Sequence, residues 1–120
     1  MTPRKCLVVE DRLDTAETFV LVLRTLGHEA EYVTDPLMAF EAARRLCPDV
    51  AFLDIGLPKM TGYELAQRLK SEFPRLCLVA VTGYGLPEYQ QRGREAGFHA
   101  YLPKPADIDA IQQILANLFK

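Results

Sequence analysis

Three short stretches of this chain are almost continuously apolar: Lys5–Val9, Val50–Leu53 and Leu76–Val81. A strand with one face in water alternates apolar and polar side chains, whereas a strand covered on both faces is apolar throughout. Strands of the second kind are typical of parallel sheets flanked by helices. The three runs therefore predict an α/β protein with a buried parallel sheet.

Helix signals alternate with these runs. Asp14 with Glu17 and Thr61 with Glu64 resemble capping boxes, and Asp35 precedes a proline at the first helical turn. The last predicted helix places its large aliphatic residues on one face, namely Ile108, Ile111, Ile114, Leu115 and Leu118. The predicted helices are Asp14–Leu26, Asp35–Leu46, Thr61–Phe73, Pro87–Ala96 and a helix capped by Asp107 that runs through Leu118.

Two weaker strands complete the pattern. Ala30–Val33 is more polar and is predicted near a sheet edge, and Ala100–Leu102 is short. Five β-α units in 120 residues predict one domain, residues 1–120, built as a doubly wound parallel sheet. Right-handed crossovers place the carboxyl ends of all strands at one edge, where ligands of such sheets bind.

Composition excludes several classes of function. The formal net charge is −2 at pH 7, so bulk charge attracts no nucleic acid. No apolar run approaches the roughly 20 residues of a membrane span, and no signal peptide is visible, which favours a cytoplasmic protein. Cys6, Cys47 and Cys77 are odd in number and form no C-x-x-C pair, so we expect buried, reduced thiols. His28 and His99 are predicted at the surface.

Charged residues follow three of the strand-like segments. Glu10 and Asp11 come after the first run, Asp54 ends the third strand, and Lys104 follows the fifth. Because these strand ends meet at one edge, we expect the side chains to converge. Clustered carboxylates repel one another and offer the hard oxygen ligands that Mg²⁺ prefers. The pattern predicts a site for Mg²⁺ and a phosphoryl group.

Asp54 is the predicted nucleophile of this site, forming an aspartyl phosphate, because Thr61 already supplies the cap of the next helix. Lys104 would pair with Asp54 and then with the phosphoryl oxygens. Thr82, at the end of the fourth strand, could donate its hydroxyl to the same oxygens. Tyr101 is either half-buried packing or a ring that rotates inward when Thr82 moves. Whether the Lys104–Pro105 peptide bond is cis stays open at this point.

Together these segments resemble the receiver domain of two-component response regulators over essentially the whole chain. The matching pieces are Val8–Asp11, Phe52–Glu64, Val81–Gly85 and Tyr101–Pro105. The resemblance implies a flavodoxin-like sheet with strand order 2-1-3-4-5. It also implies a module that phosphorylates and dephosphorylates itself but turns over no separate substrate.

The resemblance assigns roles at the site. A phosphohistidine of a sensor kinase or a histidine phosphotransfer protein would donate the phosphoryl group to Asp54. Lys104 and Thr82 would bind the phosphoryl oxygens, and Thr82 with Tyr101 would form the conformational switch. Glu10, Asp11, Asp54 and the backbone carbonyl of Gly56 would hold Mg²⁺. A homodimer through the fourth helix, fifth strand and last helix is a further implied partner surface.

Some features differ or stay open. Thr61 stands where the family often has aspartate, and Tyr84-Gly85 resembles receivers attached to hybrid kinases. The chain is either a stand-alone receiver, a phosphorelay shuttle or a piece of a larger protein. On the first helix, the face of Leu21 or Val22 beside Thr15 and Thr18 is a candidate docking surface for a kinase helix.

Two rival functions remain. A Mg²⁺-dependent phosphatase of the haloacid dehalogenase type would also use an aspartate nucleophile. Such enzymes carry a second aspartate two residues later, where this chain has Gly56. The other rival is an interaction module that keeps the fold without being phosphorylated.

Overall fold

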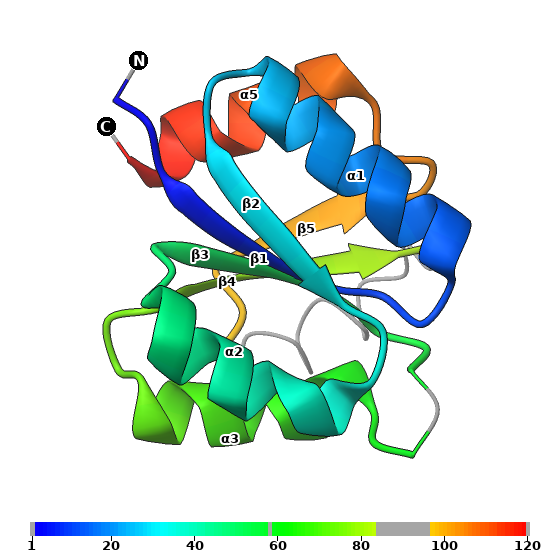
Figure 1. The fold of residues 1–120 in the computed structure, drawn as a ribbon, viewed down its shortest axis with the longest axis vertical. Helices are drawn as coiled ribbons and strands as arrows, with labels where there is room; N and C mark the ends of the chain where they lie inside the picture. Colours follow the sequence, from blue (N-terminus) through cyan, green and yellow to red (C-terminus); the bar gives the residue numbers. More distant parts are fainter. Residues whose placement is uncertain (1, 58, 84–96, 120) are drawn as a thin grey trace.

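The computed structural model describes residues 2–57, 59–83 and 97–119. Its five strands form one parallel sheet in the order β2-β1-β3-β4-β5 (Figure 1), which confirms the predicted fold class and strand order. The predicted helix Pro87–Ala96 lies outside the described residues. The elements are β1 (Lys5–Val9), α1 (Leu13–Thr25), β2 (Glu29–Val33), the 3₁₀-helix η1 (Pro36–Met38), α2 (Ala39–Leu46), β3 (Val50–Asp54), α3 (Gly62–Glu72), β4 (Cys77–Thr82), β5 (Ala100–Pro103) and α5 (Ile108–Leu118).

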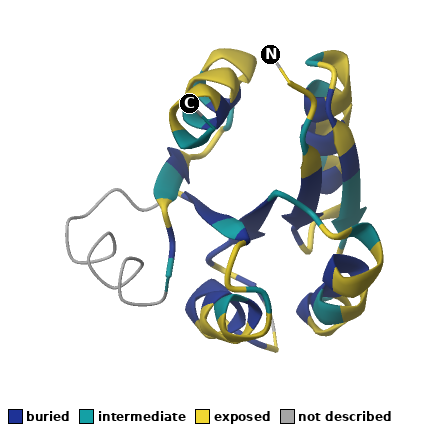
Figure 2. Cartoon of the chain, turned by 90° about the vertical axis from the view of Figure 1, so that its left-hand side faces the viewer, coloured by how far each residue is buried: buried dark blue, intermediate teal, exposed yellow. Residues whose placement is uncertain are grey.

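The sheet lies between two layers of helices, with α1 and α5 on one face and α2 and α3 on the other (Figures 1 and 2). Each face has its own apolar core. Phe52 and Leu102 belong to the core under α1 and α5, whereas Leu53 and Leu78 belong to the core under α2 and α3. This two-sided burial explains why the central strands are apolar throughout rather than alternating.

The edge strands differ from the central ones as the sequence predicts. Every residue of β3 is buried, whereas in β2 only Ala30 is. β1 pairs in parallel with β2 on one side and with β3 on the other, so that Val9 lies opposite both Val33 and Leu53. This register brings the last residues of the strands to the same edge of the sheet.

Three of the predicted helix caps are confirmed. The Asp35 carboxylate accepts from the backbone N–H of Leu37 at 2.9 Å, and the Thr61 hydroxyl accepts from that of Glu64 at 3.2 Å. Asp107 accepts from the N–H of Ala110 at 2.8 Å. These bonds satisfy amide groups that the first helical turn leaves without partners.

The predicted cap at Asp14 is wrong. α1 begins at Leu13 with Arg12 as the N-cap residue, and the Arg12 side chain makes no capping bond. Helical bonding has already started there, since the Ala16 N–H donates to the Arg12 carbonyl at 2.9 Å. Asp14 therefore lies inside the first turn, where a carboxylate interacts favourably with the helix dipole.

The predicted burial of the cysteines is wrong for Cys47 and only partly right for Cys77. Cys47 is exposed because it ends α2 in the left-handed conformation, with φ 51°. Cys6 is buried as predicted, and Cys77 is half-buried. Ile108 is exposed at the start of α5, although Ile111 and Leu115 on the same predicted face are buried.

None of the described helices combines the length and apolar character needed to cross a membrane.

The prediction of surface histidines is wrong for His28, which is buried. Its Nδ1 accepts from the backbone N–H of Arg4 at 2.9 Å. His99 is exposed as predicted, but its Nδ1 likewise accepts from the Leu78 N–H at 3.1 Å. Both imidazoles thus accept an amide hydrogen from a neighbouring strand or its approach, a contact that local sequence does not reveal.

Candidate metal and phosphoryl site

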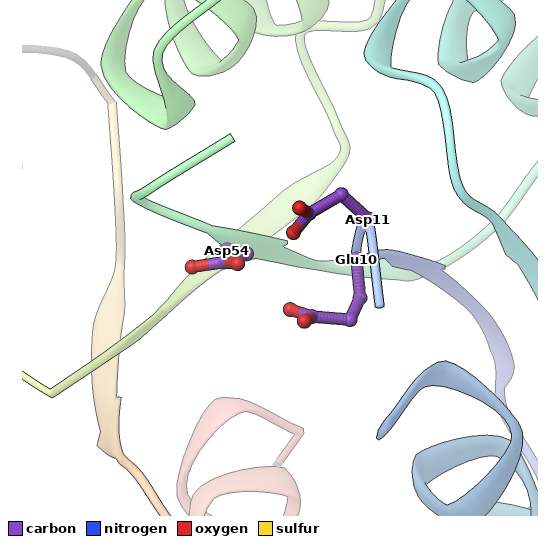
Figure 3. Close-up of side chains that lie close together, drawn as sticks. All are labelled: Glu10, Asp11 and Asp54. Carbon is purple, nitrogen blue, oxygen red and sulfur yellow. The ribbon is translucent and has the colours of Figure 1, made fainter. Parts of the chain in front are cut away.

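Three carboxylates converge at the carboxyl edge of the sheet. Glu10 and Asp11 follow β1, and Asp54 is the last residue of the neighbouring strand β3. Each contributes an oxygen, and these oxygens lie within 4.8 Å of one another (Figure 3). The structure thus brings together residues 43 or more positions apart in sequence, as the parallel register requires.

Two of the three acids are withdrawn from water. Glu10 is 4% exposed and Asp54 is 7% exposed, whereas Asp11 faces solvent. The pKa of Glu10 is raised to about 7, chiefly by burial and then by Asp54 and Asp11, while the Lys104 ammonium opposes the increase. Glu10 therefore takes up a proton far more readily than an ordinary glutamate.

Lys104 supplies the positive charge facing this cluster. Its Nζ lies 3.2 Å from Asp54 Oδ2 and 3.5 Å from Glu10 Oε2. The Lys104 backbone N–H donates to the Thr82 carbonyl at 2.9 Å, which attaches the residue to the end of β4. The following peptide bond to Pro105 is cis. The pairing of Lys104 with Asp54 is as the sequence predicts.

The backbone around Asp54 is held on two sides. The Gly56 N–H donates to Asp54 Oδ1 at 3.0 Å, and the Ile55 N–H donates to the Val81 carbonyl at 3.2 Å. On the other side, α3 begins directly against β3. A Cβ on Gly62 would lie 2.6 Å from the Asp54 carbonyl oxygen, so only glycine permits this approach.

The residues present fit a hard divalent cation. Three carboxylates face one lysine, which leaves excess negative charge at a partly buried site. Among the described residues, none makes a hydrogen bond to Glu10 Oε1, although that oxygen is buried. A buried carboxylate oxygen in this position is suited to a metal ligand.

Thr82 and Tyr101 lie on the strands next to the acidic cluster. Thr82 is buried at the end of β4, one residue beyond Val81, which pairs with Asp54. Tyr101 is half-buried in β5, and its ring centroid lies 6.3 Å from that of Phe98. Tyr84 and Gly85, which belong to the same sequence motif as Thr82 (Val81–Gly85), lie outside the described residues.

A groove of about 470 Å³ runs beside Lys104 toward α1. Thr15, Thr18 and Val22 from α1 line it, which are three of the residues that the sequence suggested for docking. Leu21 is 64% exposed and is absent from the groove lining, whereas Phe19, Val20 and Leu23 are buried. Of the two apolar docking candidates on α1, the half-buried Val22 therefore lines the groove beside Lys104, and Leu21 does not.

One contact at this edge was not foreseen from the sequence. Lys59 lies in the loop between β3 and α3, and its Nζ pairs with Asp35 Oδ2 at 2.7 Å. The sequence identifies Asp35 only as the cap of a helix. No local signal joins the two residues, because their contact depends on how two separate loops lie beside each other.

Comparison with known proteins identifies the family. The family model described as the response regulator receiver domain matches residues 6–116. TcrX of Mycobacterium tuberculosis, a probable transcriptional regulatory protein, is 36% identical over 98% of this chain and 50% of its own length. The polar-differentiation response regulator DivK of Brucella anthropi is 30% identical over 88% of each chain.

Longer relatives and solved structures agree. The sensor histidine kinase RcsC of Salmonella typhi is 33% identical over 92% of this chain, which spans only 12% of that protein. The structure of the chemotaxis protein CheY4 of Vibrio cholerae superposes with a TM-score of 0.92 at 25% identity, covering 98% of this chain and 100% of that one. With its fold, its acidic edge and these matches, the chain belongs to the response regulator receiver domain family.

Proposed function

We propose that Asp54 is the phosphoacceptor of this receiver domain. The observation that carries the proposal is that Asp54 belongs to the carboxylate cluster and also lies 3.2 Å from the Lys104 ammonium. In the proposed reaction an Asp54 carboxylate oxygen forms a bond to phosphorus. The phosphorus–nitrogen bond of a phosphohistidine breaks. Its electron pair stays on that nitrogen, and because the other ring nitrogen carries a proton, the leaving group is a neutral histidine.

The chain's own residues would manage the charge of this transfer. Lys104 offsets the negative charge of Asp54 before transfer and would pair with the phosphoryl oxygens afterwards. Thr82 would donate its hydroxyl to one of those oxygens from the end of β4. Glu10, Asp11, Asp54 and the Gly56 carbonyl would hold Mg²⁺, which neutralises charge on the phosphoryl group when bound.

The same residues would connect phosphorylation to a change of shape. In the proposed switch Thr82 moves toward the phosphoryl group and Tyr101 turns from its half-buried position into the space that Thr82 leaves. The aspartyl phosphate would later be hydrolysed within the same domain, so the protein acts as a timed signal and not as an enzyme with a separate substrate.

Receiver domains interact with histidine kinases, and here we propose the groove beside α1 as the phosphodonor surface. It connects the exposed part of α1 with Lys104. The donor would be a kinase or a phosphotransfer protein in the cytoplasm, and residues 1–120 would act as one receiver unit. A homodimer through the predicted fourth helix, which lies outside the described residues, together with β5 and α5 is a further proposal that follows from the family.

The two rival functions have less support. A haloacid dehalogenase-type phosphatase needs a general acid two residues after its nucleophile, and that position is Gly56. A pure interaction module would not need to hold three carboxylates and a lysine together at a buried edge. Sustained hydrolysis of a generic phosphate ester would favour the first rival, and failure to take up a phosphoryl group would favour the second.

Acetyl phosphate with Mg²⁺ tests the proposal directly. We expect the wild type to gain the mass of one phosphoryl group and Asp54→Asn to gain none. Asp109→Asn, an exposed acid on α5, is the matched control and should be phosphorylated like the wild type. Lys104→Ala should mainly lose the conformational response, measured by the NMR shifts of Tyr101. A phosphoryl group that persists in Asp54→Asn would refute the assignment.

A further inference from the structure

Two loops at the carboxyl edge of the sheet are joined by one ion pair. Lys59 belongs to the loop that follows Asp54, and Asp35 belongs to the junction between β2 and η1. Lys59 Nζ lies 2.7 Å from Asp35 Oδ2, and the pair is partly exposed, at 58% for Lys59 and 35% for Asp35. The Lys59 ammonium holds the pKa of the Asp35 carboxyl below its usual range.

Lys59 lies in the segment of residues 55–61 that joins β3 to α3, here called the Asp54 loop. Lys59 adopts φ 57°, in the left-handed region that non-glycine residues rarely occupy. On either side of it, Leu57 and Met60 are buried in the core under α2 and α3. The loop is thus anchored by the side chains of Leu57 and Met60, and the ion pair restrains Lys59 between them.

The Asp35 end is also held firmly. Its second oxygen, Oδ1, accepts from the Leu37 N–H at 2.9 Å, so both carboxylate oxygens are engaged. Two residues before Asp35, the Val33 carbonyl accepts from the Glu10 N–H at 3.2 Å. The ion pair therefore connects the loop that follows Asp54 with the end of β2, whose Val33 carbonyl accepts from the Glu10 N–H.

We propose that Asp35 and Lys59 are positioning residues that keep the Asp54 loop in the arrangement able to bind a divalent cation. The proposal rests on the proposed function, since the cation site is the one described above. Neither side chain touches the reacting groups. Both act through the backbone of the loop, which sets where Gly56 lies relative to Asp54 and Glu10. Because the pair is partly exposed, we expect an effect of about two- to five-fold on cation affinity.

The sign of the effect separates positioning from simple electrostatics. If the two residues acted only through their charge, Lys59→Met would strengthen Mg²⁺ binding and Asp35→Asn would weaken it. The positioning role predicts weaker binding in both variants. Asn can still cap η1, so Asp35→Asn removes the charge while keeping the helix start.

Isothermal titration with Mg²⁺ measures these affinities in the full chain. We expect Lys59→Met and Asp35→Asn each to raise Kd by about two- to five-fold, with the double variant no worse than either single one. Arg44→Met is the matched control, since it breaks an ion pair of 2.7 Å and similar exposure between α2 and α3.

Amide exchange of Gly56 in metal-free protein provides the second measurement, and we expect faster exchange in both single variants than in the wild type. Wild-type Kd together with wild-type exchange in these variants would overturn the positioning role and leave the proposed function intact. Opposite shifts of Kd in the two variants would also overturn it, in favour of charge alone. A wild type that binds no Mg²⁺ would reject the metal site itself, whatever the exchange rates.

Discussion

At the scale of single residues, the structure explains why charged groups are buried at one end of an apolar sheet. Glu10 and Asp54 are almost fully buried, and Lys104 compensates only part of their charge. Their positions after strands were predictable because strand ends can be located from apolar runs. Their distances and the raised pKa of Glu10 were not, because they depend on packing between strands.

The two histidines support a prediction about acid stability. Desolvation is the main cause that lowers the pKa of the buried His28 and, although His99 is more exposed, of His99 as well, with Arg4 and Lys70 as the next contributors. The folded state thus favours neutral imidazoles, whereas the unfolded chain takes up protons near the usual pKa of 6.5. The stabilisation is complete above that pH and is lost as the pH falls through the lower folded values.

We therefore expect the contribution of the two histidines to the free energy of unfolding to decrease as the pH falls below about 6.5, opposite in sign to the contribution of Glu10, and urea denaturation of the wild type and of histidine variants measures it. The variants His28→Asn and His99→Asn keep an acceptor near the position of Nδ1 but do not titrate. Their unfolding free energy should depend less on pH between 5 and 7. An unchanged pH dependence in the double variant would show that other groups control acid stability.

At the scale of elements, the helix caps and strand positions were largely predictable, whereas contacts between elements were not. Thr61 and Glu64 predict the start of α3 from the sequence alone, because capping is an interaction between residues close together in the chain. That Gly62 packs directly on the backbone of β3 is a tertiary contact. The predicted cap at Asp14 failed because α1 starts one residue earlier, with Arg12 as an N-cap residue that makes no side-chain bond and so leaves no signal in the sequence.

The close approach at Gly62 predicts a large effect of one methyl group. In Gly62→Ala the new Cβ would lie 2.6 Å from the Asp54 carbonyl oxygen and 2.8 Å from the Ile55 Cα, so the backbone must shift. We expect a loss of about 1–3 kcal/mol in the free energy of unfolding, measured by urea denaturation. Gly83→Ala is the control, because its Cβ would meet no atom of the described residues within 4 Å, and it should be nearly neutral. Equal stability of the two variants would contradict this account.

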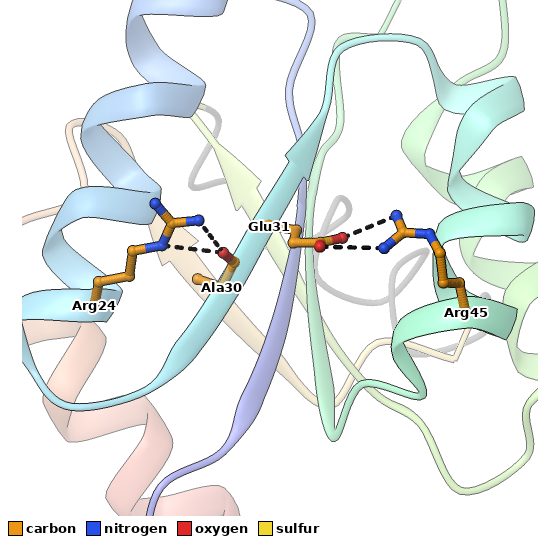
Figure 4. A network of polar contacts seen from close by, with 4 residues as sticks. All are labelled: Arg24, Ala30, Glu31 and Arg45. Atoms are coloured by element: carbon orange, nitrogen blue, oxygen red, sulfur yellow. Dashed lines mark hydrogen bonds and ion pairs between the residues drawn. The ribbon is translucent and has the colours of Figure 1, made fainter.

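The edge strand β2 is covered on its outer side by an arginine. The Arg24 guanidinium from α1 donates to the Ala30 carbonyl at 2.8 and 3.2 Å, while Arg45 from α2 pairs with Glu31 (Figure 4). Because alternate residues of β2 bond to β1, the Ala30 carbonyl faces away from the sheet. Exposed edge groups of this kind can pair with another chain.

Removing the Arg24 side chain should therefore weaken the edge. We expect Arg24→Ala to lose about 1 kcal/mol in the free energy of unfolding, together with more self-association in analytical ultracentrifugation. Arg24→Lys keeps the charge but not the two-pronged geometry, so its loss should be smaller. Wild-type stability and a monomer at high concentration for Arg24→Ala would show that the edge needs no such cover.

At the scale of the whole molecule, the acidic site opposes folding when no cation is bound. The pKa of Glu10 is raised from 4.5 to about 7, so the folded state binds a proton more tightly than the unfolded chain. For such a group the stabilisation is present below the unfolded pKa and is lost as the pH rises through the folded value. In metal-free protein, the contribution of Glu10 to the free energy of unfolding should therefore decrease as the pH rises from about 5 to 8.

Glu10→Gln tests whether the ionised Glu10 carboxylate destabilises the metal-free protein. The variant removes the titrating charge but keeps the size of the side chain, so metal-free Glu10→Gln should be more stable than the wild type at pH 8. The difference should vanish near pH 5, as measured by thermal or urea unfolding. In the wild type, Mg²⁺ should stabilise more at pH 8 than at pH 5.5. A wild type whose metal-free stability is unaffected by Glu10→Gln at pH 8 would contradict this view.

The sequence by itself determined the parallel α/β sheet, the presence of the edge strands and the placement of acids and a lysine after particular strands. These features are readable because periodicity, capping and strand ends depend on neighbouring residues. Only the tertiary structure decided that Glu10 carries a raised pKa, that His28 is buried, and that Lys59 reaches Asp35. Such properties depend on the distance and water exclusion between segments far apart in the chain, which no local pattern specifies.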